Sequence, residues 1–159
     1  MSIDPELDLT IERVIHAPRA KIWSAWTDPG KLARWWLPAP AVCRVERLEP
    51  RPGGAFVTSM SEDGTTFADH LNACFLAVDE LERLVWTNAV DGDLRPTAGL
   101  PFPLTADVTL ADHPEGTDYR VVVRHGDPKA RAKHEEMGFF EGWGTVTAQL
   151  AALAEGGPA

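Results

Sequence analysis

The residues of this sequence best suited to acid–base chemistry are His70, His125 and Glu141. A carboxylate on a helix face beside an aromatic residue loses part of its hydration, which raises its pKa toward the neutral range. Together with an inward-facing histidine, such a group can act as an acid or base on a bound carbonyl or lactone. The sequence also fits a structural role, which we favour, with Glu141 facing solvent and His125 capping a helix.

Other short motifs of catalytic or metal sites are incomplete. His134-Glu135 begins the zinc-binding pattern HExxH, but Gly138 stands where the second histidine would be needed. Asp69-His70 and Asp112-His113 place an acid next to a histidine, yet neighbours in a strand point to opposite faces and cannot form a catalytic dyad. We therefore expect no metal site, no cofactor and no nucleophilic hydrolase.

Composition and charge narrow the class of partner and the compartment. Fifteen basic against 24 acidic residues give a net charge of -9, which disfavours binding to nucleic acid or to anionic lipid. The longest uncharged stretch, 142–154, is too short to insert across a membrane. Cys43 and Cys74 have no CxxC spacing, and the N-terminus has no apolar signal region. These features predict two reduced thiols and a cytoplasmic location.

Hydropathy periods and turn residues give the order of the elements that must position these groups. A strand with alternating apolar and polar residues comes first, and two short helices rich in tryptophan follow. After them the hydropathy pattern repeats every two residues, which is typical of strands. Asp127-Pro128 reads as the cap and first residue of a long final helix. The predicted strands cover 7–16, 41–48, 54–61, 66–78, 84–89, 104–111 and 118–125; the helices begin at Pro18, near 31 and at Pro128, the last ending near 155.

This order defines an α+β fold. Six consecutive strands joined by short turns form an antiparallel meander. A sheet of this kind and one amphipathic helix bury both apolar surfaces only if the sheet curls around the helix. We expect a helix-grip: a curved antiparallel sheet of six to seven strands around a long C-terminal helix, with two short helices after the first strand. Residues 1–159 would form a single domain.

Strand alternation predicts an inner face that is mostly apolar, with a few polar groups. In the strand 84–89 it places Leu84, Trp86 and Asn88 on the inner face. In the preceding strand the inner face would carry His70 and Asn72 together with Cys74, Leu76 and Val78, which leaves Ala73 on the outer face. Apolar walls with isolated polar atoms are typical of a small-molecule cavity, although a solid core with a polar rim gives the same pattern. The predicted ligand-binding residues are His70, Asn72, Trp86, Asn88, Val121, His125, Met137, Phe140 and Glu141.

Four segments resemble a known family. They are APRAKIWSAWTDPGKLARWW (17–36), RPGGAF (51–56), CFLAVDELERLVWT (74–87) and HEEMGFFEGWGTVTAQL (134–150). They are similar to the activator of heat-shock protein 90 ATPase homologues, within the START-like (SRPBCC, helix-grip) superfamily. The resemblance implies the same grip and, for short members, carriage or binding of hydrophobic molecules. In this resemblance, close relatives have a histidine where this chain has Phe140, which argues against a polar or metal role for that segment.

The predicted function is therefore binding of a small hydrophobic or aromatic molecule in a cavity between the curved sheet and the C-terminal helix. The first alternative is a chaperone-contacting protein, which the family name implies, although the eukaryotic namesake makes that contact with an additional domain that we do not expect here. The second alternative is a cyclase or hydrolase that uses His125 or Glu141 on a hydrophobic ligand. Exposed edge strands would allow a homodimer.

Overall fold

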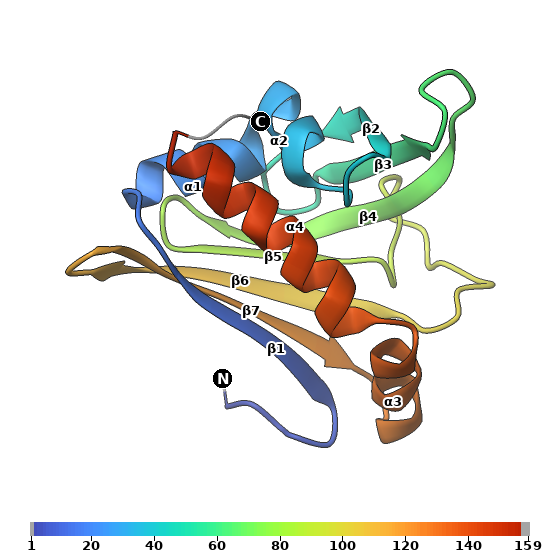
Figure 1. Ribbon diagram of the computed structural model, residues 1–159. Coiled ribbons are helices and arrows are strands. Elements are labelled where there is room, and N and C mark those ends of the chain that lie inside the picture. Colours follow the sequence, from blue (N-terminus) through green and yellow to red (C-terminus); the bar gives the residue numbers. More distant parts are fainter. Residues whose placement is uncertain (1, 157–159) are drawn as a thin grey trace.

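A computed structural model describes residues 2–156 and has an α+β architecture (Figure 1). All seven strands form one antiparallel sheet, in the order β1-β7-β6-β5-β4-β3-β2. The strands are β1 (Asp8–Ile15), β2 (Val42–Leu48), β3 (Ala55–Ser61), β4 (Ala68–Asp79), β5 (Arg83–Thr87), β6 (Leu104–His113) and β7 (Gly116–His125). The helices are α1 (Arg19–Thr27), α2 (Pro29–Trp35), α3 (Pro128–Glu136) and α4 (Phe139–Ala154).

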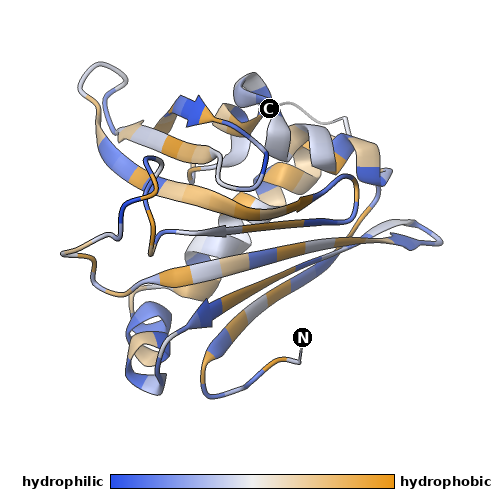
Figure 2. Cartoon of the chain, turned by 180° about the vertical axis from the view of Figure 1, so that it is seen from behind, coloured by the Kyte–Doolittle hydropathy of each residue, from blue (hydrophilic) through white to orange (hydrophobic). Residues whose placement is uncertain are grey.

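The sheet curves around α4, which crosses its concave face diagonally, with α1 and α2 packed at one end of the helix (Figure 1). Seen from behind, the strands lie in front of α4 (Figure 2). The N-terminal strand β1 closes the meander by pairing with the last strand, β7. The predicted helix-grip is therefore confirmed, including the two short helices after the first strand.

The two short helices, with the residue that follows them, deliver three of the buried tryptophans. Asp28 separates them, because its side chain accepts the N–H of Lys31 and caps α2. Trp26 and Trp35 are each about 1% exposed and meet edge to face, with ring centroids 4.9 Å apart. Trp36 extends this cluster onto the sheet, where it packs 5.1 Å from the ring of Phe56. Edge-to-face contacts of this kind fix the rings in place as well as burying them.

The C-terminal helix is interrupted, which corrects the prediction of one continuous helix. The predicted start is confirmed, since Asp127 caps α3 by accepting the N–H of Ala130 at 2.7 Å. After Glu136, Gly138 adopts a left-handed conformation with φ of 94°, which glycine tolerates and other residues rarely do. The chain changes direction there, so α4 crosses the sheet while α3 packs against β1 and β7 (Figure 1).

Two irregularities in β4 correct the predicted inner face of that strand. The pairing with β3 shifts between Thr58 and Ser59, and the pairing with β5 shifts between Phe75 and Ala77. Each shift inserts one unpaired residue and reverses the alternation. Ala73 and Phe75 are consequently fully buried in the core, whereas Leu76 is 49% exposed. The alternation predicted for β5 and β7 is correct, because the pairings keep Trp86 in register with Ala106 and Ala106 with Val123.

Candidate functional site

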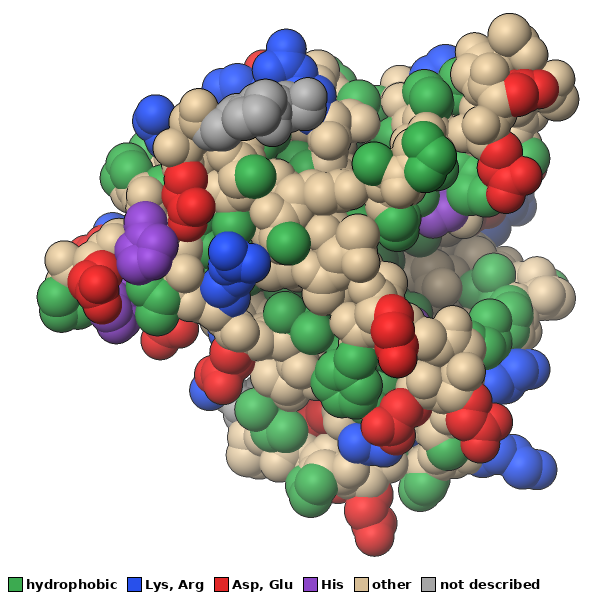
Figure 3. All heavy atoms as spheres, in the orientation of Figure 1, with side chains coloured by type: hydrophobic (Ala, Val, Ile, Leu, Met, Phe, Trp, Pro, Cys, Tyr) green, Lys and Arg blue, Asp and Glu red, His purple; other side chains and the backbone are tan. Residues whose placement is uncertain are grey.

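An apolar cleft of about 260 Å³ lies between α4 and the middle of the sheet, and we call it the central cleft. Figure 3 shows the molecular surface hollowed at this side of α4. Elements far apart in the sequence contribute to it: the end of α2 and the residues after it, β4, β5, the start of β6, and α4. Its lining residues are Trp36, Leu37, Pro38, His70, Leu71, Trp86, Leu104, Gly142, Trp143 and Val146.

Three tryptophans form the walls of the central cleft. The rings of Trp86 and Trp143 are nearly parallel, with an angle of 11° between their planes and 6.4 Å between their centroids. Trp36 meets Trp86 edge to face at 5.8 Å. Gly142 widens the cleft, because a side chain at this position would meet nothing within 4 Å. The walls therefore offer flat aromatic surface next to open space.

His70 is the polar group among these walls. It is the residue left unpaired where the β3–β4 pairing shifts, and its Nδ1 lies 3.0 Å from the hydroxyl of Thr58. The ring is accessible to solvent through the open cleft, yet the surrounding protein displaces enough water to lower its pKa. His70 is consequently neutral at pH 7, so it can donate or accept one hydrogen bond without adding charge.

A second hollow, the side hollow, adjoins the central cleft and shares His70 and Leu71 with it. The predicted site residues Asn72 and Asn88 both line it. Their side-chain oxygens accept backbone N–H groups of Gly92 and Leu104, each at 2.8 Å. Both amides therefore anchor the loop between β5 and β6, and they lie beside the central cleft rather than in it.

The other predicted residues do not line the central cleft. Val121 is fully buried in the core. His125 is also buried, with Nδ1 2.8 Å from the carbonyl oxygen of Leu7 and Nε2 2.9 Å from Nδ1 of His134. Since a carbonyl can only accept, the His125 ring donates from Nδ1 to Leu7, and its Nε2 pairs with Nδ1 of His134. Both nitrogens of His125 are thus engaged in packing α3 against the sheet.

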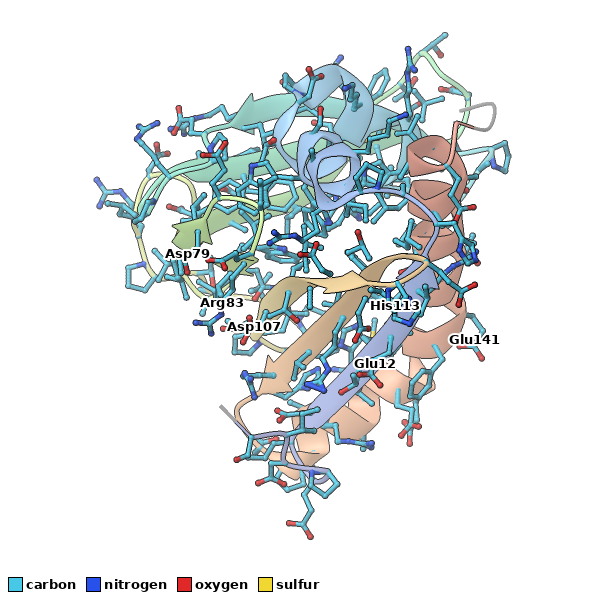
Figure 4. All side chains as sticks on the ribbon, turned by 90° about the vertical axis from the view of Figure 1, so that its left-hand side faces the viewer. Glu12, Asp79, Arg83, Asp107, His113 and Glu141 are labelled. Atoms are coloured by element: carbon cyan, nitrogen blue, oxygen red, sulfur yellow. The ribbon has the colours of Figure 1, made fainter. Side chains whose placement is uncertain are left out.

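The inward orientation predicted for Met137, Phe140 and Glu141 is wrong. Met137 is 62% exposed and Phe140 is 45% exposed, while Phe139 is buried instead. Figure 4 shows Glu141 on α4 pointing away from the strands. The turn at Gly138 causes this, because it resets the helical phase that a continuous helix would have carried into α4.

Sequence reasoning missed several lining residues. Leu37, Leu104, Trp143 and Val146 were not among the predicted ligand-binding residues, although Trp143 and Val146 belong to an apolar seam spaced by three and four residues in the C-terminal helix. Trp36 was also absent, because adjacent tryptophans are expected to divide between core and rim, whereas Trp35 and Trp36 both join the core and Trp36 also lines the cleft.

Charged groups gather on the opposite face of the sheet. Asp107 accepts two hydrogen bonds from Arg83, both at 2.9 Å, and Arg124 bridges Asp107 to Asp8. Burial raises the pKa of Asp107, but the hydrogen bonds and charges of the two arginines outweigh it and lower the pKa overall. Figure 4 shows Arg83 and Asp107 together, on the side away from α4. These ion pairs hold strands together and contribute nothing to the central cleft.

Within residues 2–156, no group of three His, Cys, Asp or Glu side chains is arranged to hold a metal ion. Over the same range, none of the helices combines the length and the apolar character needed to cross a membrane. Cys43 and Cys74 are buried and unpaired.

A curved antiparallel sheet around a C-terminal helix, with an apolar cleft between them, defines a START-like helix-grip protein. A profile of the family described as "Activator of Hsp90 ATPase homolog 1-like protein" matches residues 16–155. The chain therefore belongs to that family. No protein of curated function matches the sequence.

Several solved structures are similar to this chain. A protein from Nitrosomonas europaea is 38% identical, with a TM-score of 0.84 and 97% of each chain covered. A protein from Mycobacterium smegmatis is 28% identical, with a TM-score of 0.75, covering 93% of this chain and 90% of that one. An AHSA1-like protein from Aeromonas hydrophila, 23% identical with a TM-score of 0.65 and 94% and 93% coverage, shares the fold.

Proposed function

We propose that this protein binds a small hydrophobic or aromatic molecule in the central cleft. The observation that carries the proposal is an open, uncharged space of about 260 Å³ walled by Trp36, Trp86 and Trp143. Soluble domains normally fill such space with side chains, whereas here Gly142 leaves it open. Apolar walls with one orienting polar group, His70, are the usual composition of a ligand site.

The size of the cleft sets the expected affinity. A two-ring hydrocarbon that loses about 300 Å² of accessible surface gains a gross free energy of about 7 kcal/mol, at roughly 25 cal/mol per Å². Lost translation and rotation oppose this gain. Generic probes should consequently bind with micromolar or weaker dissociation constants.

The test compares two substitutions in α4 by calorimetric titration with tetralin. Neither Gly142 nor Gly144 has another group within 4 Å of an added Cβ, so both should accept a leucine. Only Gly142 lines the central cleft. We expect Gly142→Leu to abolish tetralin binding and Gly144→Leu to leave it unchanged. Ala73, which strand alternation placed on the outer face, is unsuitable as a control because it lies in the core.

Equal effects of the two leucines, or no saturable binding of tetralin to the unaltered protein, would overturn the proposal. The two variants share the same gain in helix propensity, so a difference between them reports on the cleft rather than on helix stability. Thermal unfolding of both variants verifies that each is folded before titration.

The family description supports a second candidate, contact with a chaperone. The matching observation is the pair of exposed apolar side chains, Met137 and Phe140, at the corner between α3 and α4. Copurification with purified Hsp90, compared between the unaltered protein and Phe140→Ser, tests it. Retention that depends on Phe140 and not on Gly142 would favour this candidate. The enzymatic alternative has less support, because neither His125 nor Glu141 lines the central cleft.

We further infer that the chain acts as one domain in the cytoplasm. Two buried, unpaired cysteines fit a reducing compartment.

A further inference from the structure

Two indole N–H groups beside the central cleft have no hydrogen-bond acceptor within residues 2–156. They belong to Trp36 and Trp86, which are 7% and 2% exposed. Two neighbouring tryptophans behave differently: Trp26 donates to the hydroxyl of Tyr119 at 3.1 Å, and Trp35 donates to a backbone carbonyl at 2.9 Å. Buried N–H groups are nearly always paired, so a pair of exceptions at one site needs a cause.

The two indole rings that carry the unpaired groups are neighbours in the wall of the cleft. Trp36 and Trp86 contact each other edge to face, at 5.8 Å between centroids, and both line the open space. A carbonyl oxygen has two lone pairs and can accept two hydrogen bonds at once. Both indole nitrogens are themselves buried, so one such oxygen in the cleft could satisfy both N–H groups once the rings turn toward it.

We propose that the ligand is an uncharged ring compound carrying a carbonyl-type oxygen, which accepts hydrogen bonds from the indoles of Trp36 and Trp86. This inference rests on the proposed binding function and specifies the class of ligand. Its ring body would lie against Trp143, whose plane is within 11° of that of Trp86.

The lining of the cleft excludes an anionic ligand from this role. Its residues include no lysine or arginine. The titratable group in the lining, His70, has its pKa lowered because the surrounding protein displaces water from the ring, and it is neutral at pH 7. Moving a carboxylate out of water without a cationic partner is costly, and the net charge of -9 opposes anions further. A neutral ketone needs no such partner.

An internal explanation for the unpaired N–H groups would be contact with a ring face. Phe56 lies against both indoles, at 5.1 Å from Trp36 and 5.3 Å from Trp86. An N–H group over an aromatic face forms only a weak hydrogen bond. If Phe56 satisfies both groups, an added ketone will gain nothing, so the experiment separates the two explanations.

The experiment is a titration of the ¹⁵N-labelled protein with tetralin, 1-tetralone and 1-naphthoate, followed by the indole N–H signals in NMR. Tetralin and 1-tetralone have nearly the same shape and differ in one carbonyl. We expect 1-tetralone to bind about tenfold more tightly than tetralin, as one or two well-formed hydrogen bonds would give. The naphthoate should bind more weakly than either.

The signals of the protein locate the hydrogen bonds. The N–H resonances of Trp36 and Trp86 should move downfield with 1-tetralone but not with tetralin, while those of Trp26 and Trp35 stay fixed as internal controls. Trp86→Phe keeps an aromatic wall and removes one donor, so it should narrow the difference between the two probes. Trp23→Phe, away from the cleft, should leave that difference unchanged.

The outcomes distinguish this inference from the proposed function. Equal affinity for tetralin and 1-tetralone, with unchanged indole signals, would overturn the inference and leave the binding function standing. Tighter binding of naphthoate than of the ketone would also overturn it. Failure of every probe to bind would overturn the binding function itself.

Discussion

A pair of imidazoles beside α3, His125 buried and His134 half-buried, makes the stability of this protein depend on pH. His134 packs between two phenylalanines, with ring centroids 4.6 Å from Phe102 and 5.0 Å from Phe139, and its Nδ1 lies 2.9 Å from Nε2 of His125. Burial, followed by the electrostatic influence of the neighbouring His125 ring, lowers the pKa of His134 from 6.5 to about 4. The folded protein therefore holds this ring neutral where the unfolded chain would protonate it.

The size of this pH effect on stability follows from the difference between the pKa values of His134 in the unfolded and folded states. Between pH 6.5 and about 4 the unfolded state binds one proton more than the folded state does, so stability falls as the pH falls through this range. At about 1.36 kcal/mol per pH unit, the full loss is about 3 kcal/mol, and the loss down to pH 4.5 is somewhat over 2 kcal/mol. Above pH 6.5 the contribution of His134 is constant.

Urea unfolding at pH 7 and pH 4.5 measures the effect, compared with His134→Asn. Asparagine keeps a donor for His125 but cannot be protonated. Between pH 7 and pH 4.5, we expect the free energy of unfolding to fall by about 2 kcal/mol more in the unaltered protein than in this variant. The carboxylates titrate in both proteins, so their contribution to the loss of stability in acid is the same and drops out of the difference. His16→Asn, which removes an exposed histidine, should behave as the unaltered protein does. If the unaltered protein and His134→Asn differ by less than about 0.5 kcal/mol in this loss of stability, the lowered pKa of His134 is refuted.

Other predictions concern the packing of α4 and the thiols. Gly138→Ala should cost about 1–2 kcal/mol in urea unfolding because its φ is 94°, whereas Gly142→Ala should stabilise by up to about 1 kcal/mol as an open position within α4. Leu150→Ala should cost about 2–5 kcal/mol, because the side chain is fully buried against the sheet; a cost under about 1 kcal/mol would mean that α4 is misplaced. Cys43, whose pKa burial raises to about 11, and Cys74 should react with a thiol reagent at pH 8 only after unfolding; recovery of no thiols from unfolded, unreduced protein would indicate a disulfide.

The order of the elements could be predicted because it depends on local signals. Alternation in β5 and β7 and the Asp127-Pro128 start of α3 follow from neighbouring residues. The sheet had to curl around the helix because both have one apolar face. These local and topological rules together were sufficient for the helix-grip.

The composition of the cleft was less predictable because it depends on small breaks in regular structure. The unpaired residue at the β3–β4 shift turns Ala73 inward, and the unpaired Leu76 at the β4–β5 shift lies outward; nothing in the strand sequence marks either position. The turn at Gly138 rotated Met137 and Phe140 to the surface, although the apolar spacing continues across it. Trp36 reaches the cleft only through the long-range packing of α2.

The most direct test of the central claim is to locate a bound probe by intermolecular nuclear Overhauser effects. With tetralin near saturation, the account predicts contacts from its protons to the indole of Trp86, to the methyl groups of Val146 and to the ring of Trp36, which together surround the cleft. Contacts to the exposed side chains of Met137 and Phe140 instead, or none from residues that line the cleft, would contradict it.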